Sequence, residues 1–535
     1  MIAARAGPAP AAPARRGRDL GGRGSAGERL RSLAAIGVPT ALGAALCLYE
    51  ITTRSLGFDE FASVTIAAAH GGALGSAIAH DGGNMAGYYV LLHVLIGALG
   101  NSALVVRLPS ALAGAATVAI VGLLAGRLFG RQCAFVSGLL SAVSLPLVFW
   151  AQDARGYAPM VALASSSFLA LVVLVDRDSS RRARRWAWIA YVVLTTLAVY
   201  CSFVAVLVVP AQLVTLLWHR RPLRRVASAL AVCALACAPL VVLAVQRGSG
   251  QLFWVSRPSI AGATGVLETL TSSALAPSFR VTSTAAILLG LTGAILIAVA
   301  AAIGRGLSRR AEDWPEWGQT LVLAWLVVPV ALAGLESLVG QPIFLPRNLL
   351  MSMPAVALLL GWGISDRRVP RPVAWSLLAG VLALRVLQLI PSYGVSPEDW
   401  RAASAHVLAR SHPGDCIAFY PSDGRMAFQY YVGTGTIRTS RAPLSVLPSL
   451  PWGEVRPYVE DYVIPSRSQL SGLPGRCPRL WLVSSHSGQP DGPRRSRANH
   501  ARYLELLSTL TGEYGDRDTA SFGYASPVRV ELLAR

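Results

Sequence analysis

The chain has 535 residues, of which 53% are hydrophobic and only 14% charged, and its mean hydropathy of +0.49 excludes an ordinary soluble domain. The formal net charge is +20, and the sequence contains Arg but no Lys. These arginines gather in short loops between apolar segments, as in the cytoplasmic loops of membrane proteins. The position of the arginines therefore predicts which loops are cytoplasmic, and we expect no nucleic-acid partner.

Residues 1–31 are rich in Ala, Pro, Gly and Arg without apolar periodicity, which predicts a disordered cytoplasmic tail. Residues 32–390 predict an α-helical transmembrane domain, because a helix needs roughly 20 apolar residues to cross the hydrocarbon core. Segments of sufficient length lie near 33–51, 106–126, 132–150, 157–175, 226–245, 284–304, 318–338, 347–364 and 371–390.

Residues 186–218 form one long apolar segment. As a single helix it would be about 50 Å long, against a hydrocarbon core of roughly 30 Å. Arginines flank it on both sides, and such flanks favour the cytoplasm: Arg181, Arg182, Arg184 and Arg185 before it, and Arg220, Arg221, Arg224 and Arg225 after it. The segment therefore predicts two spans joined by a tight turn near Cys201 and Ser202.

Residues 86–100 are too short for a span and aromatic at one end, so they predict an interfacial helix on the outer membrane surface. If this segment crossed the membrane, the arginine-rich loops near 181–185, 220–225 and 367–371 would lie outside. The sequence thus predicts about 11 spans in the plasma membrane with the N-terminus in the cytoplasm. The outer loops are then about 52–105, 151–156, 246–283 and 339–346.

Residues 391–535 are less apolar and predict a small extracytoplasmic α/β domain, because strand patterns alternate with helix patterns. Expected helices are 398–410 and 502–510, and expected strands are 416–420, 479–485 and 528–534. Cys416 and Cys477 each stand at the start of a strand. In an oxidising compartment these two cysteines could pair, which predicts a disulfide between the two strands.

The segment SLGFDEFASVTIAAA places Asp59 and Glu60 just after the first span, in an outer loop. Carboxylates beside a bilayer are costly and are often kept for chemistry, such as a general base or a metal ligand. The alternative is that the pair only caps the N-terminus of a surface helix, where the helix dipole stabilises acids.

Four segments carry a resemblance to a known superfamily: the Asp59–Glu60 pair, VVRLPSALAG with Arg107 and Pro109, WAQDARGYAP at 150–159, and FLPRNLLMSMPAVALLL at 344–360. In this order the chain resembles the GT-C superfamily of membrane glycosyltransferases, and most closely the bacterial branch related to protein O-mannosyltransferases and lipid A aminoarabinose transferases. The segment DWRAASAHVLARSHPGD also looks like the exported part of bacterial members.

Three positions depart from the family pattern. Asp153 replaces a common Glu, Asn348 stands where an aromatic residue is common, and NMAGYY at 84–89 replaces an Asn/His-Pro-Pro-x-Tyr-Tyr-like motif. The last of these includes Tyr88 and bears on the shape of the donor or acceptor groove.

The resemblance implies transfer of a sugar, such as mannose or a pentose like arabinose, from a polyprenyl-phosphate donor to an acceptor hydroxyl. The acceptor is a glycan, a lipid or a protein, and membrane lipid surrounds the chain. A carboxylate that takes the acceptor proton lowers the barrier, so Asp59 is the candidate base, with Glu60 positioning Asp59 or the acceptor. Arg347 and Arg155 are the candidate ligands of the donor phosphate. Snorkelling to lipid headgroups is the alternative for both arginines.

Further candidates for the substrate cavity are Asp153, His80, Asp81, Arg107, Tyr88, Trp254 and Arg257. Asp153 is expected to orient Arg155, bind the acceptor, help hold a divalent ion, or form a simple salt bridge. His80, Asp81 and His93 have no standard metal-ligand spacing, so no cofactor is expected and a divalent ion is the alternative. Trp254 and Arg257 either gate the cavity or lie at the membrane interface, where Trp is common.

Two other classes of protein would also have many spans. A lipid or glycan flippase would carry charged residues near the membrane midplane or a paired repeat, whereas here Arg385 is almost alone inside a span. A structural subunit would not need Asp59, Arg155 and Arg347 on one face. Convergence of the three residues on one cavity open to the lipid would favour the transferase.

Overall fold

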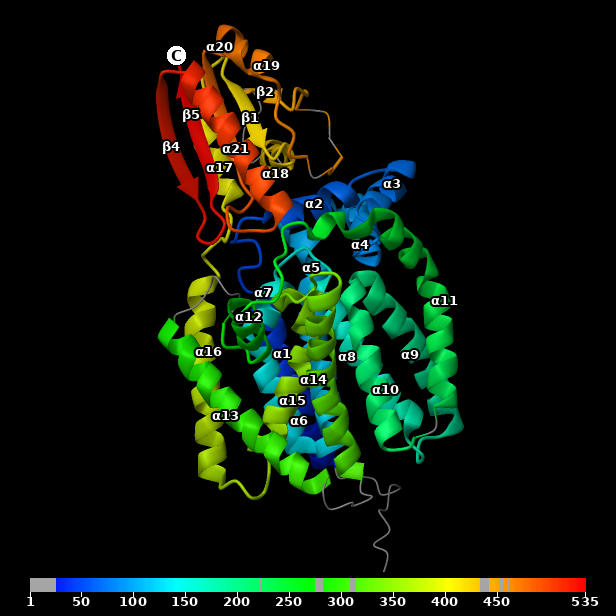
Figure 1. The fold of residues 1–535 in the computed structure, drawn as a ribbon. Helices are drawn as coiled ribbons and strands as arrows, with labels where there is room; N and C mark the ends of the chain where they lie inside the picture. The colour runs from blue at the N-terminus through cyan, green and yellow to red at the C-terminus, as the bar shows by residue number, and fades with distance from the viewer. Residues whose placement is uncertain are drawn as a thin grey trace, which may run out of the picture.

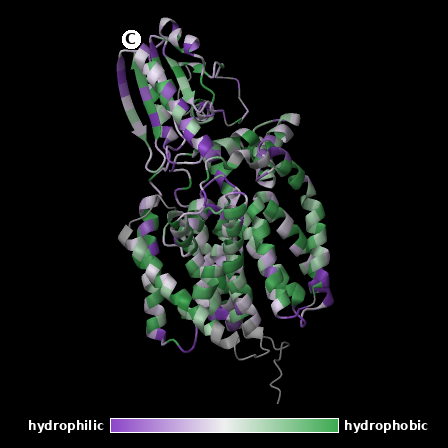
Figure 2. Cartoon of the chain, in the orientation of Figure 1, coloured by the Kyte–Doolittle hydropathy of each residue, from purple (hydrophilic) through white to green (hydrophobic). Residues whose placement is uncertain are grey.

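The protein was analysed as a computed structural model, which describes residues 26–221, 223–274, 282–307, 314–433, 442–452, 454, 457–459 and 461–535. A long helix bundle forms one end of the molecule, and the C-terminal α/β domain stands on the other end (Figure 1). Hydrophobic residues dominate the bundle and hydrophilic ones gather at its ends and in the C-terminal domain (Figure 2). Residues 1–25 of the predicted tail lie outside the described residues, and helix α1 already begins at Ala26.

Eight described helices are long and apolar enough to cross a membrane, or nine if the bent pair α6–α7 is one span. The protein is therefore a multi-pass membrane protein. The pair consists of α6 (Arg131–Ala142) and α7 (Leu145–Ala151), bent by 58°. The eight are α1 (Ala26–Leu48), α5 (Ala103–Phe129), α8 (Tyr157–Val175), α11 (Arg224–Arg247), α13 (Thr282–Leu307), α14 (Trp314–Val339), η3 (Pro346–Ser352) with α15 (Met353–Ile364), and α16 (Arg371–Ser392).

The apolar segment after residue 186 breaks where the sequence predicted a turn. Helix α9 (Arg181–Cys201) ends at Cys201, and η1 (Phe203–Leu207) and α10 (Val208–Trp218) follow Ser202. Tyr191 on α9 donates to Gln212 Oε1 on α10 at 2.6 Å, so the two helices pack against each other. Neither α9 nor α10 counts among the eight, because arginines open α9 and because η1 with α10 is short. The described helices therefore leave the count of 11 spans unestablished.

Three short helices cover the end of the bundle that faces the C-terminal domain: α2 (Phe58–Ala67), α3 (Gly72–His80) and α4 (Ala86–Leu99) (Figure 1). The 14-residue α4 is the short helix that the sequence predicted. Gly83 lies between α3 and α4 with φ +78°, and a Cβ there would come 3.0 Å from Leu243 Cδ1 of α11. This turn therefore needs glycine both for its backbone angle and for its close approach to α11. Two more short elements, η2 (Gly248–Leu252) and α12 (Ile260–Leu270), follow α11.

Arg385 lies inside α16 and is buried, where an unpaired charge would be costly. Its guanidinium donates to the Leu140 carbonyl at 2.7 Å and to the Thr271 carbonyl at 3.0 Å. Leu140 is in the last turn of α6, and Thr271 is the C-cap of α12. Arg385 thus caps two helix ends, whose carbonyls lack intrahelical partners and carry the negative end of the dipole.

The C-terminal domain is a five-stranded mixed sheet with strand order β2-β1-β3-β5-β4. Strand β1 runs parallel to β2 and β3, while β5 is antiparallel to β3 and β4. The strands are β1 (Cys416–Tyr420), β2 (Leu444–Leu447), β3 (Arg479–Ser484), β4 (Asp516–Phe522) and β5 (Val528–Ala534). The helices are α17 (Trp400–Arg410), α18 (Gly424–Gly433), α19 (Arg467–Ser471), α20 (Leu473–Arg476) and α21 (Arg494–Glu513).

The predicted strands correspond to β1, β3 and β5, and the predicted helices to α17 and part of α21. Strands β2 and β4 were missed, because β2 has only four residues and β4 is an edge strand with largely exposed side chains and little apolar signal. A disulfide joins Cys416 to Cys477 with a Cα–Cα distance of 5.6 Å, which confirms the predicted pairing. It ties the first residue of β1 to the segment just before β3.

Candidate active site

A cavity of about 960 Å³ lies between the helix bundle and the C-terminal domain. Five elements contribute charged or aromatic side chains to its wall: Asp59 from α2, Arg155 from the loop before α8, Trp254 from the loop before α12, Arg347 from η3, and His486 from the loop after β3. The first and fourth of these are 288 residues apart in the chain. The structure therefore brings Asp59, Arg155 and Arg347 together on one cavity.

Asp59 faces this cavity, with half of its side chain exposed. Arg347 Nη1 lies 3.2 Å from Asp59 Oδ2, and Arg155 Nη1 donates to the Asp59 backbone carbonyl at 3.3 Å. Burial raises the pKa of Asp59, but the charges of Arg155, Arg347 and His486 outweigh that effect and hold the pKa below its ordinary value. The carboxyl is therefore ionised at neutral pH and ready to accept a proton or a hydrogen bond.

Glu60 lies at the cavity wall, but its carboxylate is held in a buried cluster, with only 6% of its side chain exposed. Arg107 binds both of its oxygens, at 2.8 and 2.7 Å. The backbone N–H groups of Gly57 and Ala154 donate to the same carboxylate at 2.9 and 2.8 Å. The bond from Gly57 caps α2, so the helix-capping alternative applies to Glu60, whereas Asp59 stays open to the cavity.

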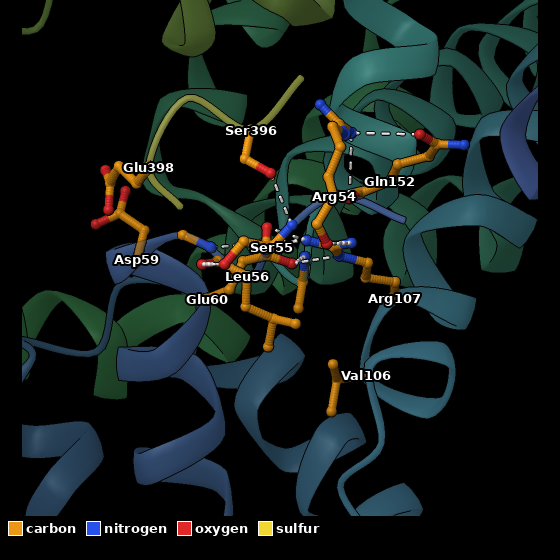
Figure 3. A network of polar contacts seen from close by, with 12 residues as sticks. Arg54, Ser55, Leu56, Asp59, Glu60, Val106, Arg107, Gln152, Ser396 and Glu398 are labelled. Atoms are coloured by element: carbon orange, nitrogen blue, oxygen red, sulfur yellow. Dashed lines mark hydrogen bonds and ion pairs between the residues drawn. The ribbon is translucent and has the colours of Figure 1, made fainter. Parts of the chain in front are cut away.

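Arg107 holds the loop before α2 in place (Figure 3). Besides Glu60, its guanidinium donates to the carbonyls of Ile51, Arg54 and Ser55 at 2.9–3.0 Å. All five N–H donors of the group are thereby used. Arg107 therefore has no donor left for a substrate and acts as a framework residue that fixes the start of α2.

Arg347 lies against two aromatic rings, with its guanidinium carbon 4.9 Å from the Trp254 ring centre and 5.8 Å from that of Tyr157. Arg155 donates to Ser63 Oγ at 3.2 Å and to Tyr89 Oη at 3.4 Å. Cation–π contacts and hydroxyl partners orient both guanidinium groups without neutralising them. Two oriented positive charges thus face the same space as Asp59.

Asp153 also lines the cavity, and its Oδ1 is buried with no hydrogen-bond partner among the described residues. It forms no ion pair with Arg155 in the part of the chain that the structure describes, so the simple salt bridge is absent there. Burial and the nearby charge of Glu60 raise the pKa of Asp153 well above its usual range. A protonated Asp153 would be a hydrogen-bond donor toward a ligand.

The remaining candidate residues do not all line the cavity. Asp81 lines the cavity and accepts from Tyr89 Oη at 2.9 Å. Tyr88 is buried against Val106 and Ser110 outside the cavity wall. His93 contacts the Ala67 carbonyl at 2.8 Å. Three predicted residues, Tyr88, His80 and His93, are thus outside the lining, and Arg257 lines a separate groove beside the end of α14.

No group of three or more His, Cys, Asp or Glu side chains that could hold a metal ion occurs within the described residues. His80, Asp81, His93 and Asp59 are therefore not gathered into such a group.

Comparisons with known proteins show which fold the chain has. A family described as dolichyl-phosphate-mannose-protein mannosyltransferase matches residues 85–246. The solved structure of ArnT from Cupriavidus metallidurans in the apo state matches with a TM-score of 0.58 at 14% identity, covering 92% of this chain and 97% of that one. The chain has the GT-C fold.

Two further solved structures support the same fold. ArnT from Cupriavidus metallidurans bound to undecaprenyl phosphate matches with a TM-score of 0.54 at 13% identity, over 93% of this chain and 98% of that one. The archaeal oligosaccharyltransferase AglB from Archaeoglobus fulgidus, in complex with an inhibitory peptide and a dolichol-phosphate, matches with a TM-score of 0.52 at 10% identity, over 86% and 70% of the two chains. Comparison with curated protein sequences finds no match.

On this GT-C frame, the cavity also receives residues that the sequence did not single out. Asp423 follows β1, and His486 and Gln489 follow β3. The carboxyl ends of parallel strands commonly carry binding residues in α/β domains, so the predicted strands 416–420 and 479–485 held the signal that would have found them. Glu398, from the loop before α17, gave no such signal, because only the tertiary structure places it beside α2.

Proposed function

We propose that the protein is a membrane glycosyltransferase. It moves a sugar from a polyprenyl-phosphate-linked donor to an acceptor hydroxyl at the outer face of the plasma membrane. The observation that carries this proposal is the convergence of Asp59, Arg155 and Arg347 on one cavity beside the membrane helices. A carboxylate and two arginines are the groups that this reaction needs, one for a proton and two for a phosphate.

The cavity wall has an apolar part and a positively charged part, which suit the lipid and the phosphate of the donor. Apolar residues of α11, Val241, Ala244 and Val245, line one side, and they suit the first isoprene units of a lipid. Arg347 and Arg155 face the same space and suit the phosphate, since a guanidinium binds phosphate oxygens in a bidentate manner. The solved GT-C structures bound to undecaprenyl phosphate and to dolichol-phosphate are consistent with such a donor.

The ion pair between Asp59 and Arg347 suggests an order of events. A donor phosphate competes with Asp59 for Arg347, so its binding frees the carboxylate. The acceptor oxygen then attacks the anomeric carbon while its proton passes to Asp59. The bond from that carbon to the phosphate oxygen breaks, and the lipid phosphate leaves with the electron pair. Arg347 and Arg155 stabilise the charge that grows on it.

Glu60 contributes to this reaction by position. Its four hydrogen bonds leave it no free oxygen for the acceptor, but they fix the first turn of α2, which carries Asp59. Positive charge for the phosphate comes from the two arginines, so we propose no metal cofactor, and transfer should persist in excess chelator.

The sugar is proposed as a hexose such as mannose or a pentose such as arabinose, and the acceptor as a glycan, a lipid or a protein. The decisive experiment supplies purified protein in lipid vesicles with a panel of polyprenyl-phosphate sugars and membrane-derived acceptors, and follows release of lipid phosphate together with glycosylated product. A D59N variant is the control for contaminating transferases. Movement of the donor lipid across vesicles without any sugar transfer would replace the proposal by the flippase alternative.

A further inference from the structure

The C-terminal domain contributes strand-end loops to the cavity. Strands β1 and β3 are parallel neighbours, and their carboxyl ends lie at the same edge of the sheet. The residues that follow them, Asp423 after β1 and His486 and Gln489 after β3, all line the cavity. Loops at this edge are where α/β domains commonly bind ligands. The domain is therefore oriented with its functional edge toward Asp59.

His486 has an unusual backbone for a residue with a side chain, with φ at +53°. Such a conformation costs on the order of 1–3 kcal/mol and persists only where the surroundings impose it. It directs the imidazole toward α2, with the ring centre 5.0 Å from that of Phe58. About 39% of the side chain remains exposed to the cavity.

Glu398 connects His486 to the start of α2. Its Oε1 lies 3.2 Å from His486 Nε2. Its Oε2 accepts from the Phe58 backbone N–H at 2.9 Å and from Trp400 Nε1 at 3.1 Å. Phe58 is the residue before Asp59, and Glu398 lies beside Asp59 in Figure 3. One carboxylate therefore joins the β3 loop, α17 and the first turn of the helix that carries Asp59.

The charges around His486 favour its protonated form. Burial lowers the pKa of His486, but the carboxylates of Glu398 and Asp59 outweigh burial and the opposing charge of Arg347, so the pKa lies above its ordinary value. The same imidazolium is one of the three positive charges that lower the pKa of Asp59.

We propose that His486 and Glu398 form a positioning pair through which the C-terminal domain orients Asp59 and keeps it ionised. The inference rests on the proposed function and adds to it a role for the C-terminal domain. When donor phosphate takes Arg347 away from Asp59, His486 remains as a positive charge facing the carboxylate. The base then stays ionised until the acceptor proton arrives.

The first experiment measures the pH profile of kcat/KM for the acceptor at saturating donor, which reports the pKa values of the donor-bound enzyme. It compares H486Q and E398Q with H412Q as the matched control. His412 is an exposed histidine of the same domain outside the cavity lining. In H486Q the pKa of Asp59 should rise, because a positive charge that faces the carboxylate is removed, so the acidic limb of the profile should lie at higher pH than in H412Q. In E398Q the carboxylate that favours the imidazolium is removed, so the pKa of His486 should fall. A profile of H486Q that matches that of H412Q would overturn the inference.

A second experiment needs no turnover. The protein has eight histidines, and NMR of labelled histidine can titrate them, with the His486 signal assigned by its loss in H486Q. We expect a pKa above the ordinary value of about 6.5, and a lower one in both E398Q and D59N. An ordinary pKa that neither substitution changes would refute the pair. Wild-type protein that shows the expected titration but transfers no sugar would instead refute the proposed function alone.

Discussion

Asp59 and Glu60 differ in how many hydrogen bonds the surrounding chain donates to their carboxylates. Glu60 receives four and is buried, whereas Asp59 pairs with one arginine and is half exposed to the cavity. A carboxylate that is already saturated cannot take a proton from a substrate without breaking its own bonds. At the scale of the residue, this difference assigns the role of base to Asp59 and the role of support to Glu60.

The substitution D59N tests this assignment. Asparagine keeps the shape of the side chain but cannot accept the acceptor proton. Turnover should fall by roughly 10²–10⁴-fold while donor affinity persists or rises, because Arg347 is no longer held by the carboxylate. Single-turnover transfer and donor-binding assays on the same preparation measure both effects. Near-normal transfer by D59N would contradict the assignment.

Arg347 should respond differently. R347A removes a proposed phosphate ligand and should weaken donor binding as well as turnover. R347K should restore little, because an ammonium group can neither form the bidentate contact nor stack on Trp254 in the same way. Calorimetric or fluorescence titration with polyprenyl phosphate gives the affinity. If R347A binds the donor as tightly as wild type, Arg347 is only an interface residue.

At the scale of the element, carbonyl groups at two helix ends in the bundle have an identifiable hydrogen-bond donor. The bend between α6 and α7 leaves carbonyls at the end of α6 without intrahelical donors, and α12 ends nearby. Arg385 of α16 binds one carbonyl from each helix end. The charged residue that the sequence places inside a span is thus explained by capping, without a transport role.

R385M should therefore destabilise the protein rather than alter the chemistry. Each buried carbonyl left without a donor costs about 1–3 kcal/mol, so the midpoint of thermal unfolding in detergent should fall by several degrees. L387M, on the exposed face of the same helix, is the control and should unfold like wild type. An unchanged midpoint in R385M would show that the two carbonyls find other partners.

The disulfide between Cys416 and Cys477 links elements within the C-terminal domain across a separation of 61 residues. Closing a loop of this length restricts the unfolded chain and should stabilise the domain by about 4 kcal/mol in the chain-entropy model. The double variant C416S/C477S should therefore unfold at lower denaturant concentration, with the helix bundle less affected. Limited proteolysis at increasing denaturant concentration reports on the C-terminal domain alone. Equal protection of the wild type and C416S/C477S from cleavage would contradict the expectation.

At the scale of the whole molecule, the C-terminal domain docks on the loop that precedes Asp59. The backbone N–H of Ser55 donates to Ser396 Oγ at 2.9 Å, and Tyr431 Oη lies 3.0 Å from Ser55 Oγ. Arg401 donates to the carbonyls of Thr52 and Thr53 at 2.9 and 3.1 Å. The domain and the site must therefore be on the same side of the membrane.

This docking makes the topology testable with two fusion points. Reporter domains fused after residue 395 should be active only outside the cytoplasm, and reporters in the 176–180 loop only inside it. The physical reason is that arginine-rich loops are retained in the cytoplasm. Cytoplasmic activity of the first fusion would place the cavity inside the cell and overturn the proposed outer-face reaction.

By itself, the sequence determined the membrane class, the break near Ser202, three of the strands and the cysteine pairing. The first three depend on local hydropathy, charge and strand pattern, which act within one segment or between adjacent ones. The pairing follows because Cys416 and Cys477 are the only cysteines of the C-terminal domain. The sequence also indicated Asp59, Arg155 and Arg347, because charged residues at span ends stand out against apolar surroundings.

Only the tertiary structure decided which contacts and which position in the site each of these residues has. It paired Glu60 with Arg107, joined Arg347 to Asp59, separated His80, His93 and Tyr88 from the cavity, and placed Glu398 and His486 beside α2. Each contact joins segments far apart in the chain, so no local pattern encodes it. Whether a carboxylate is saturated or free depends on which distant donors the packing of the bundle and the C-terminal domain brings within about 3 Å of it.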